Sequence, residues 1–203
     1  MTCINRFGAT STRTPCSTQL AARPCSHSRI WVAPRIEPEI AFKLRAPLLP
    51  GCRDAGVILE SVEWMARAFE IVDCHYADRK SKGPDSVIDF SHHAALIVGE
   101  PSEIATHDIQ QLVQALRDCR VTLFRNNAVA DTGVGANALG HPALALAFLA
   151  DVVASQQQAA PLEAGEIVIT GTLTAALPAS PGEVWRTDTE GLPLPALTVR
   201  FID

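Results

Sequence analysis

The stretch "APRIEPEIAF", residues 33–42, places Glu37 and Glu39 inside an otherwise apolar run with the pattern of a β-strand. Residues i and i+2 of a strand point to the same face, so we expect the two carboxylates side by side, near Ile40 and Phe42. Adjacent anions in apolar surroundings stay ionised only beside a compensating cation. Paired carboxylate oxygens suit a hard divalent ion such as Mg²⁺ or Mn²⁺, and a solvated strand edge is the alternative interpretation.

The composition is that of a globular chain. Of its 203 residues, 47% are hydrophobic and 19% are charged, which is enough to bury the core of one domain with additions. The net charge of −5 and the lack of a Lys/Arg cluster argue against nucleic acid or an anionic membrane surface as a partner. The six cysteines form no C-x-x-C pair and no signal peptide precedes them, so we expect reduced thiols in a cytoplasmic protein.

The composition changes near residue 36. The preceding residues hold five arginines, many Ser and Thr, and three of the six cysteines, but no Asp, Glu or Lys. A transit peptide, a disordered tail and a mis-started N-terminus would each have this character. We expect an atypical, disordered segment over residues 1–32, loosely attached to one folded domain over residues 33–203.

Helical and strand patterns alternate beyond this break. The apolar spacing over residues 57–69 predicts an amphipathic helix, which runs into a short strand at 69–74. Two strands are expected around a turn at Asn126 and Asn127, and strong helix formers behind a proline predict a helix over 142–157. Helices mixed with mostly antiparallel strands indicate an α+β fold. Three further strands are predicted at "GEIVITG", "GEVWRTDTE" and "PALTVRFI".

Two other motifs fail on their spacing. The glycines Gly133, Gly135 and Gly140 lack the G-x-G-x-x-G spacing and join no strand to a helix within a βαβ unit, so we reject a dinucleotide loop. His92 and His93 are sequence neighbours and form no H-x-x-x-H pair for zinc. We interpret them as ordinary polar or core histidines.

Five segments together resemble the fumarylacetoacetate hydrolase superfamily. The similarity runs in order over residues 33–201, and it is greatest to the branch of 2-keto-4-pentenoate hydratases and 4-oxalocrotonate decarboxylases of aromatic meta-cleavage pathways. It implies a mixed β-roll or barrel with flanking helices, and makes residues 33–203 the catalytic domain. The segments are "PRIEPEIAFKL", "FEIVDCHYAD", "LGHPALALAFLAD", "AGEIVITGTLTAALPASPGE" and "LTVRF".

The resemblance assigns roles to particular residues. In that branch an E-x-E pair and a third glutamate before I-V-D ligate one Mg²⁺ or Mn²⁺, which implies Glu37, Glu39 and Glu70 as ligands here. Asp89 matches the family's catalytic aspartate. At the pocket wall, backbone N–H groups and a hydroxyl can meet a substrate carboxylate, although a plain strand end would have the same sequence. The loop matching this wall consists of Thr170, Gly171, Thr172 and Leu173.

The implied activity is that of a metal-dependent lyase acting on an unsaturated 2-oxo acid. Three carboxylates leave positions open on an octahedral ion, where a 2-oxo acid can chelate and negative charge can be stabilised. The loop "TGTLTAALPASPGE" favours 4-oxalocrotonate decarboxylase, which forms 2-hydroxypenta-2,4-dienoate and CO₂ from 2-oxohex-3-enedioate, over the hydratase. A homo-oligomer and a complex with the pathway hydratase are the implied assemblies.

The chain departs from the family in two places. Members carry a longer segment ahead of the E-x-E pair, with a G-x-K-[IV]-G lysine near the substrate, whereas the first lysine here is Lys43. Where the family reads A-D-N-[AT]-S, this chain replaces the asparagine with Phe90 and continues with two histidines. A truncated, non-catalytic homologue acting as a subunit is therefore the alternative, and we expect any activity to be weak.

Overall fold

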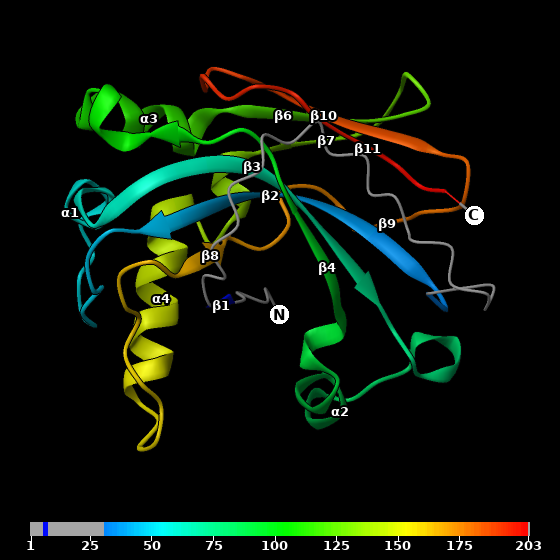
Figure 1. Cartoon of the computed structure of the whole chain (residues 1–203), viewed down its shortest axis with the longest axis horizontal. Coiled ribbons are helices and arrows are strands. Elements are labelled where there is room, and N and C mark those ends of the chain that lie inside the picture. Colours follow the sequence, from blue (N-terminus) through cyan, green and yellow to red (C-terminus); the bar gives the residue numbers. More distant parts are fainter. Residues whose placement is uncertain (1–5, 8–30, 203) are drawn as a thin grey trace.

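The computed structural model describes residues 6–7 and 31–202. The predicted disorder over residues 1–32 therefore falls largely on residues outside the described ranges. Within those ranges the strand pairs are antiparallel and form two sheets (Figure 1). Helices and antiparallel strands are mixed along the chain, so the predicted α+β class is confirmed.

The larger sheet has the order β1-β8-β2-β3-β4, with β5 added to β3 and β9 added to β2, and the smaller sheet has the order β11-β10-β6-β7. The two longest strands, β2 and β3, are neighbours at the centre of the larger sheet. The strands are β1 (Arg6–Phe7), β2 (Pro34–Leu44), β3 (Val62–Asp73), β4 (His93–Val98), β5 (Ser102–Glu103), β6 (Arg120–Arg125), β7 (Ala128–Val134), β8 (Ile167–Ile169), β9 (Leu177–Pro178), β10 (Val184–Glu190) and β11 (Leu197–Arg200).

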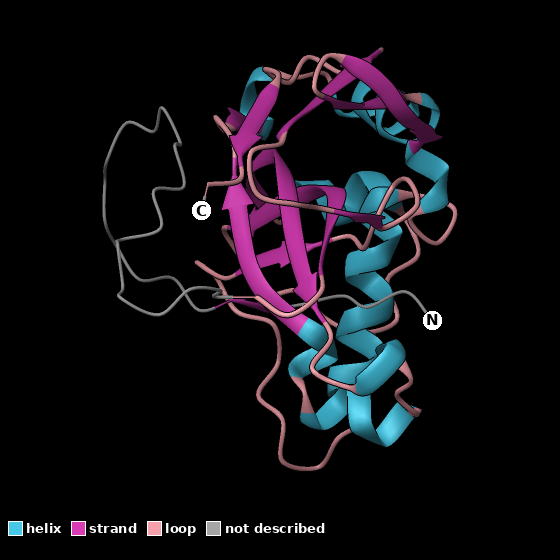
Figure 2. Ribbon diagram, turned by 90° about the vertical axis from the view of Figure 1, so that its right-hand side faces the viewer, coloured by secondary structure: helices cyan, strands magenta, loops and turns pink. Residues whose placement is uncertain are grey.

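Helices cover one side of this arrangement, so that strands make up most of one side of the molecule and helices most of the other (Figure 2). The α-helices are α1 (Ala55–Glu60), α2 (Gly83–Ile88), α3 (Ile109–Asp118) and α4 (Pro142–Ala154), and the short 3₁₀ turns are η1 (Ala77–Arg79), η2 (Phe90–His92), η3 (Ile104–Thr106) and η4 (Gly135–Asn137).

The predicted helix over residues 57–69 is wrong beyond Glu60. Asp54 caps α1 by accepting from the N–H groups of Gly56 and Val57, but the helix is only six residues long. After Ser61, the twelve residues Val62–Asp73 form β3, which pairs with β2 from one end to the other with one irregularity near Glu63. A strand that is buried on both faces does not alternate between apolar and polar residues, so its apolar positions can match helical spacing. Pairing with β2 therefore made this segment a strand, against the helical spacing of its apolar residues.

Other predicted elements are confirmed. Asn126 and Asn127 both have positive φ, 49° and 68°, as a two-residue type I′ hairpin turn between β6 and β7 requires. Helix α4 begins at Pro142 and ends at Ala154. The three strands predicted near the C-terminus are β8, β10 and β11.

The core has two large parts. One packs α1, α3 and α4 against the larger sheet, with Leu59, Leu116 and Leu146 among its buried side chains. The other lies between the two sheets and includes Phe69 and Trp185. Each fully buried side chain of this kind stabilises the fold by roughly 1.5–3 kcal/mol. The stretch 135–154 has the length and hydropathy of a membrane-crossing helix, but four buried residues of α4 belong to the first part of the core, namely Ala143, Leu146, Ala147 and Ala150.

Candidate metal centre

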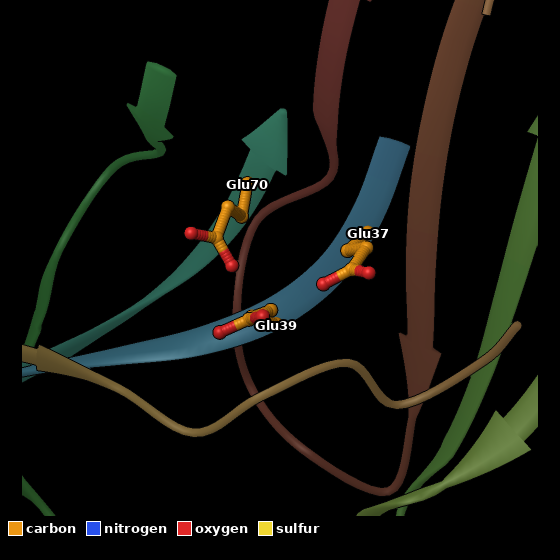
Figure 3. Close-up of side chains that lie close together, drawn as sticks. All are labelled: Glu37, Glu39 and Glu70. Carbon is orange, nitrogen blue, oxygen red and sulfur yellow. The ribbon is translucent and has the colours of Figure 1, made fainter. Parts of the chain in front are cut away.

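The pairing of β2 with β3 brings the three predicted glutamates together. Glu37 lies directly opposite Glu70 in the antiparallel register, and Glu39 follows two residues later on the same face of β2. One carboxylate oxygen from each side chain lies within 4.8 Å of the others. Figure 3 shows the side chains projecting from β2 and β3 toward a common region. Glu39 and Glu70 are 2% and 1% exposed, so this is not a solvated strand edge.

Burial and mutual repulsion raise the pKa values of Glu37 and Glu39. The pKa of Glu37 is raised to about 7, chiefly because burial disfavours the charged form and secondly because Glu70 repels it. The nearby guanidinium groups of Arg79 and Arg35 only partly oppose this shift. The pKa of Glu39 is raised well above its ordinary value, first by burial and then by the charges of Glu70 and Glu37. A bound cation would remove the cost of ionising these groups.

Glu39 shows that the site fits a cation. Its Oε2 accepts a hydrogen bond from the backbone N–H of Gly171 at 2.9 Å. Its Oε1 is buried and has no hydrogen-bond partner among the described residues. A buried polar atom without a partner is costly and calls for an explanation, such as an ion. The three carboxylates, one of which carries this oxygen, together offer the hard oxygen ligands that Mg²⁺ and Mn²⁺ prefer.

His93 is a member of the site that spacing rules did not find. Its Nδ1 lies 2.6 Å from Glu70 Oε1, and its side chain is 22% exposed. The H-x-x-x-H test excluded a zinc pair, but it could not detect a histidine that contacts a carboxylate on a neighbouring strand. The signal available in the sequence was the "HH" that follows Phe90 where the family has a different pattern.

The loop of residues 170–173 lies beside the carboxylates. Thr170 exchanges hydrogen bonds with the backbone of Ile40, and the N–H of Leu173 donates to the carbonyl of Pro38. Between them Gly171, at φ +84°, turns its N–H toward Glu39. The predicted substrate loop is thus fastened along the strand that carries two of the three glutamates. Gly133 allows this packing, because a Cβ there would lie 1.9 Å from the Leu173 carbonyl oxygen.

Asp89 lies outside the glutamate cluster, at the C-terminal end of α2. Its carboxylate accepts hydrogen bonds from Nδ1 of His92 at 2.9 Å and from Nδ1 of His75 at 2.9 and 3.1 Å. These hydrogen bonds lower the pKa of Asp89, and the bond from His92 has the larger effect. The structure therefore holds this carboxylate in its ionised form between two histidines.

Comparisons with known proteins agree with this architecture, although no family model matches the chain. The chain is 33% identical over 173 residues to 4-oxalocrotonate decarboxylase of Pseudomonas sp. strain CF600, covering 84% of this chain and 61% of that protein. It is 32% identical over 169 residues to 2-oxo-hept-4-ene-1,7-dioate hydratase of Escherichia coli, covering 78% and 58%. The chain thus spans about three fifths of the length of the curated relatives it matches.

A solved structure shows the same fold. The 4-oxalocrotonate decarboxylase from Pseudomonas putida G7, complexed with magnesium and adipate, superposes with a TM-score of 0.74 at 30% identity, over 85% of this chain and 62% of that one. A Yersinia pestis CO92 protein ascribed to the fumarylacetoacetate hydrolase family shares the fold at a TM-score of 0.60.

Fold and site together define an α+β protein with a three-carboxylate centre on a curved antiparallel sheet. The chain is related in sequence to the 4-oxalocrotonate decarboxylases and to hydratases of similar 2-oxo acids, and it shares the fold of a protein ascribed to the fumarylacetoacetate hydrolase family.

Proposed function

We propose that this protein is a divalent-metal-dependent lyase acting on an unsaturated 2-oxo acid. The observation that carries the proposal is the convergence of Glu37, Glu39 and Glu70 within 4.8 Å, with one buried carboxylate oxygen of Glu39 left unpartnered. In this proposal the three glutamates hold Mg²⁺ or Mn²⁺. The bound cation supplies Lewis-acid stabilisation of negative charge on the keto or enolate oxygen of the substrate.

The pocket-wall loop contributes a substrate contact in this proposal. The N–H groups of Gly171 and Leu173 already donate to protein acceptors. Contact with the substrate carboxylate therefore falls to the N–H of Thr172, whose hydroxyl is bonded to the Thr174 carbonyl. Thr170 keeps the loop on β2 through its bonds to Ile40 and so has a supporting role.

Asp89 is proposed as the catalytic carboxylate. Its pKa is lowered by His92 and His75, which favours an ionised group that accepts a proton over one that donates a proton. Because the two histidines donate to its oxygens, they also fix its orientation. Substitution of Asp89 by Asn should lower turnover while leaving metal affinity unchanged.

The substrate we propose is 2-oxohex-3-enedioate, decarboxylated to 2-hydroxypenta-2,4-dienoate and CO₂. Support comes from the decarboxylases among the relatives and from the related enzyme complexed with adipate, a dicarboxylate. The second candidate is a 2-keto-4-pentenoate hydratase, because hydratases match with similar identity. A cytoplasmic homo-oligomer, associated with the pathway hydratase, is the assembly we propose.

A steady-state assay tests the activity. Loss of 2-oxohex-3-enedioate should depend on added Mg²⁺ or Mn²⁺ and should disappear in the Glu70→Gln variant. Hydration of 2-hydroxypenta-2,4-dienoate, measured in parallel, separates the decarboxylase from the hydratase. A folded sample that binds metal but turns over neither substrate, even at high protein concentration, would instead favour the non-catalytic subunit.

A further inference from the structure

A β-bulge lies where β4 meets the end of β3. The two strands pair regularly up to Ile71, which lies opposite Ala95, but the next pair is Val72 with His93. Ala94 is therefore an extra residue on β4 that no residue of β3 opposes. Bulges of this kind re-aim side chains and are frequent beside functional sites.

The bulge decides which way His93 points. On β3, Glu70 and Val72 share one face because they are two residues apart. In a regular ladder Ala94 would lie opposite Val72 and share that face, and His93 would point to the other side. With the extra residue, His93 takes the position opposite Val72 and faces the carboxylates.

The contact that results is short and largely removed from water. The distance from His93 Nδ1 to Glu70 Oε1 is 2.6 Å, and Glu70 is 1% exposed. An ionised carboxylate can only accept, so Nδ1 must carry the N–H whenever Glu70 is in the form that binds a cation. Hydrogen bonds to a buried ionised group are stronger than neutral ones, and they restrict side-chain rotation.

The two fully buried glutamates are held in the same manner. Glu39 accepts from the backbone N–H of Gly171 on one oxygen, and Glu70 accepts from His93 on one oxygen. In each case one oxygen is fixed by the protein and the carboxylate is oriented as a unit. For Glu39 the donor is backbone, whereas for Glu70 it is a side chain that substitution can remove.

We propose that His93 is a positioning residue that orients Glu70 as a metal ligand, and that the Ala94 bulge places it there. This inference rests on the proposed metal site. Without the donor, Glu70 would lose a short hydrogen bond at a buried oxygen and would rotate among more conformers, so a cation would have to order it on binding. Metal affinity should fall although all three carboxylates remain.

Calorimetric titration of the full chain with Mn²⁺, at one fixed pH, tests the donor. His93→Leu should weaken Mn²⁺ binding by about 10- to 100-fold, the usual effect of losing an outer partner of a ligand. His93→Asn should stay within about threefold of the wild type, because Asn Nδ2 is as far from Cβ as His Nδ1 and keeps an N–H. His107→Leu is the matched control, since that half-buried histidine bonds Ser102 and should leave affinity unchanged.

Deletion of Ala94 tests the bulge. It should weaken Mn²⁺ binding as much as His93→Leu, although the histidine is still present, and it should add little in the His93→Leu background. Thermal unfolding without metal must show a cooperative transition for each variant, and His93→Asn keeps the test valid if the deletion does not fold.

Two results overturn the inference. One is a folded His93→Leu variant that binds Mn²⁺ as tightly as the wild type, and the other is His93→Asn as weak as His93→Leu, which would indicate packing and not an N–H donor. Wild-type protein that binds Mn²⁺ with the expected His93 dependence but shows no turnover would overturn only the lyase proposal. Loss of binding in Glu70→Gln alone, with His93→Leu unaffected, would overturn only the role of His93.

Discussion

Three carboxylates on one face of β2 and β3 are a liability unless something compensates them. Burial and repulsion raise the pKa of Glu37 to about 7 and raise that of Glu39 well above its ordinary value. Mutual repulsion of this kind is relieved by protonation or by a cation. The same arrangement therefore weakens the metal-free protein and creates affinity for a divalent ion, which is the residue-scale basis of the proposed function.

Removing one carboxylate should leave a weak two-ligand site. Glu37→Gln and Glu70→Gln should each lower Mn²⁺ affinity by at least about tenfold in calorimetric titration. Glu63→Gln is the control, because Glu63 is an exposed β3 residue paired with Lys43. If the wild type and Glu70→Gln bind Mn²⁺ alike, then Glu70 is not a ligand.

At the scale of single elements, helix α4 depends on a histidine cap. His141 Nδ1 accepts from the N–H of Ala143 at 3.0 Å, and its Nε2 lies 2.9 Å from the carbonyl of Val113. This pattern requires the neutral ring, with the N–H on Nε2 and an acceptor at Nδ1. Burial lowers the pKa of His141 below its ordinary value of 6.5.

The cap predicts a pH dependence. The unfolded chain binds a proton on His141 more readily than the folded protein does. The contribution of the cap to the free energy of unfolding is therefore complete above pH 6.5 and is lost as the pH falls below that value. The loss of the cap should cost about 1 kcal/mol in urea unfolding at acidic pH. His141→Asn keeps a capping oxygen and should flatten this dependence, whereas an unchanged pH profile in that variant would contradict the assignment.

The elements also show where local pattern is sufficient. Asn126 and Asn127 tolerate positive φ, so the turn between β6 and β7 could be predicted from two residues. The strand over residues 62–69 could not be predicted in this way, because its apolar spacing fits a helix and only pairing with β2 makes it a strand. Local rules succeed where a residue's own conformational preference decides, and they fail where a distant strand does.

At the scale of the whole molecule, Arg67 links the two sheets. It lies on β3, is 5% exposed, and its guanidinium donates to the carbonyls of Thr187 and Leu194 at 2.6 Å each. Burial lowers the pKa of Arg67 to about 10, so the residue stays charged at neutral pH. Thr187 lies on β10 in the smaller sheet, and Leu194 lies in the segment that joins β10 to β11, so the contact spans the inter-sheet core.

Loss of this link should be costly. Arg67→Met keeps the apolar stem but removes the donor that two buried hydrogen bonds share, so the free energy of unfolding should fall by about 2–4 kcal/mol in urea titration. Arg125→Met is the control, because Arg125 is exposed and makes a long ion pair with Glu183 and a cation–π contact with the ring of Trp185. A change in Arg67→Met no larger than in the control would show that the sheets are held by apolar packing alone.

The sequence by itself determined the pairing of Glu37 with Glu39 on one face, because the two-residue period of a strand is a local property. The family resemblance added Glu70. Only the tertiary structure decided that Glu70 lies opposite Glu37, that Gly171 donates to Glu39, and that a bulge turns His93 toward Glu70. Strand register and bulges depend on contacts between residues far apart in the chain, which local preferences do not encode.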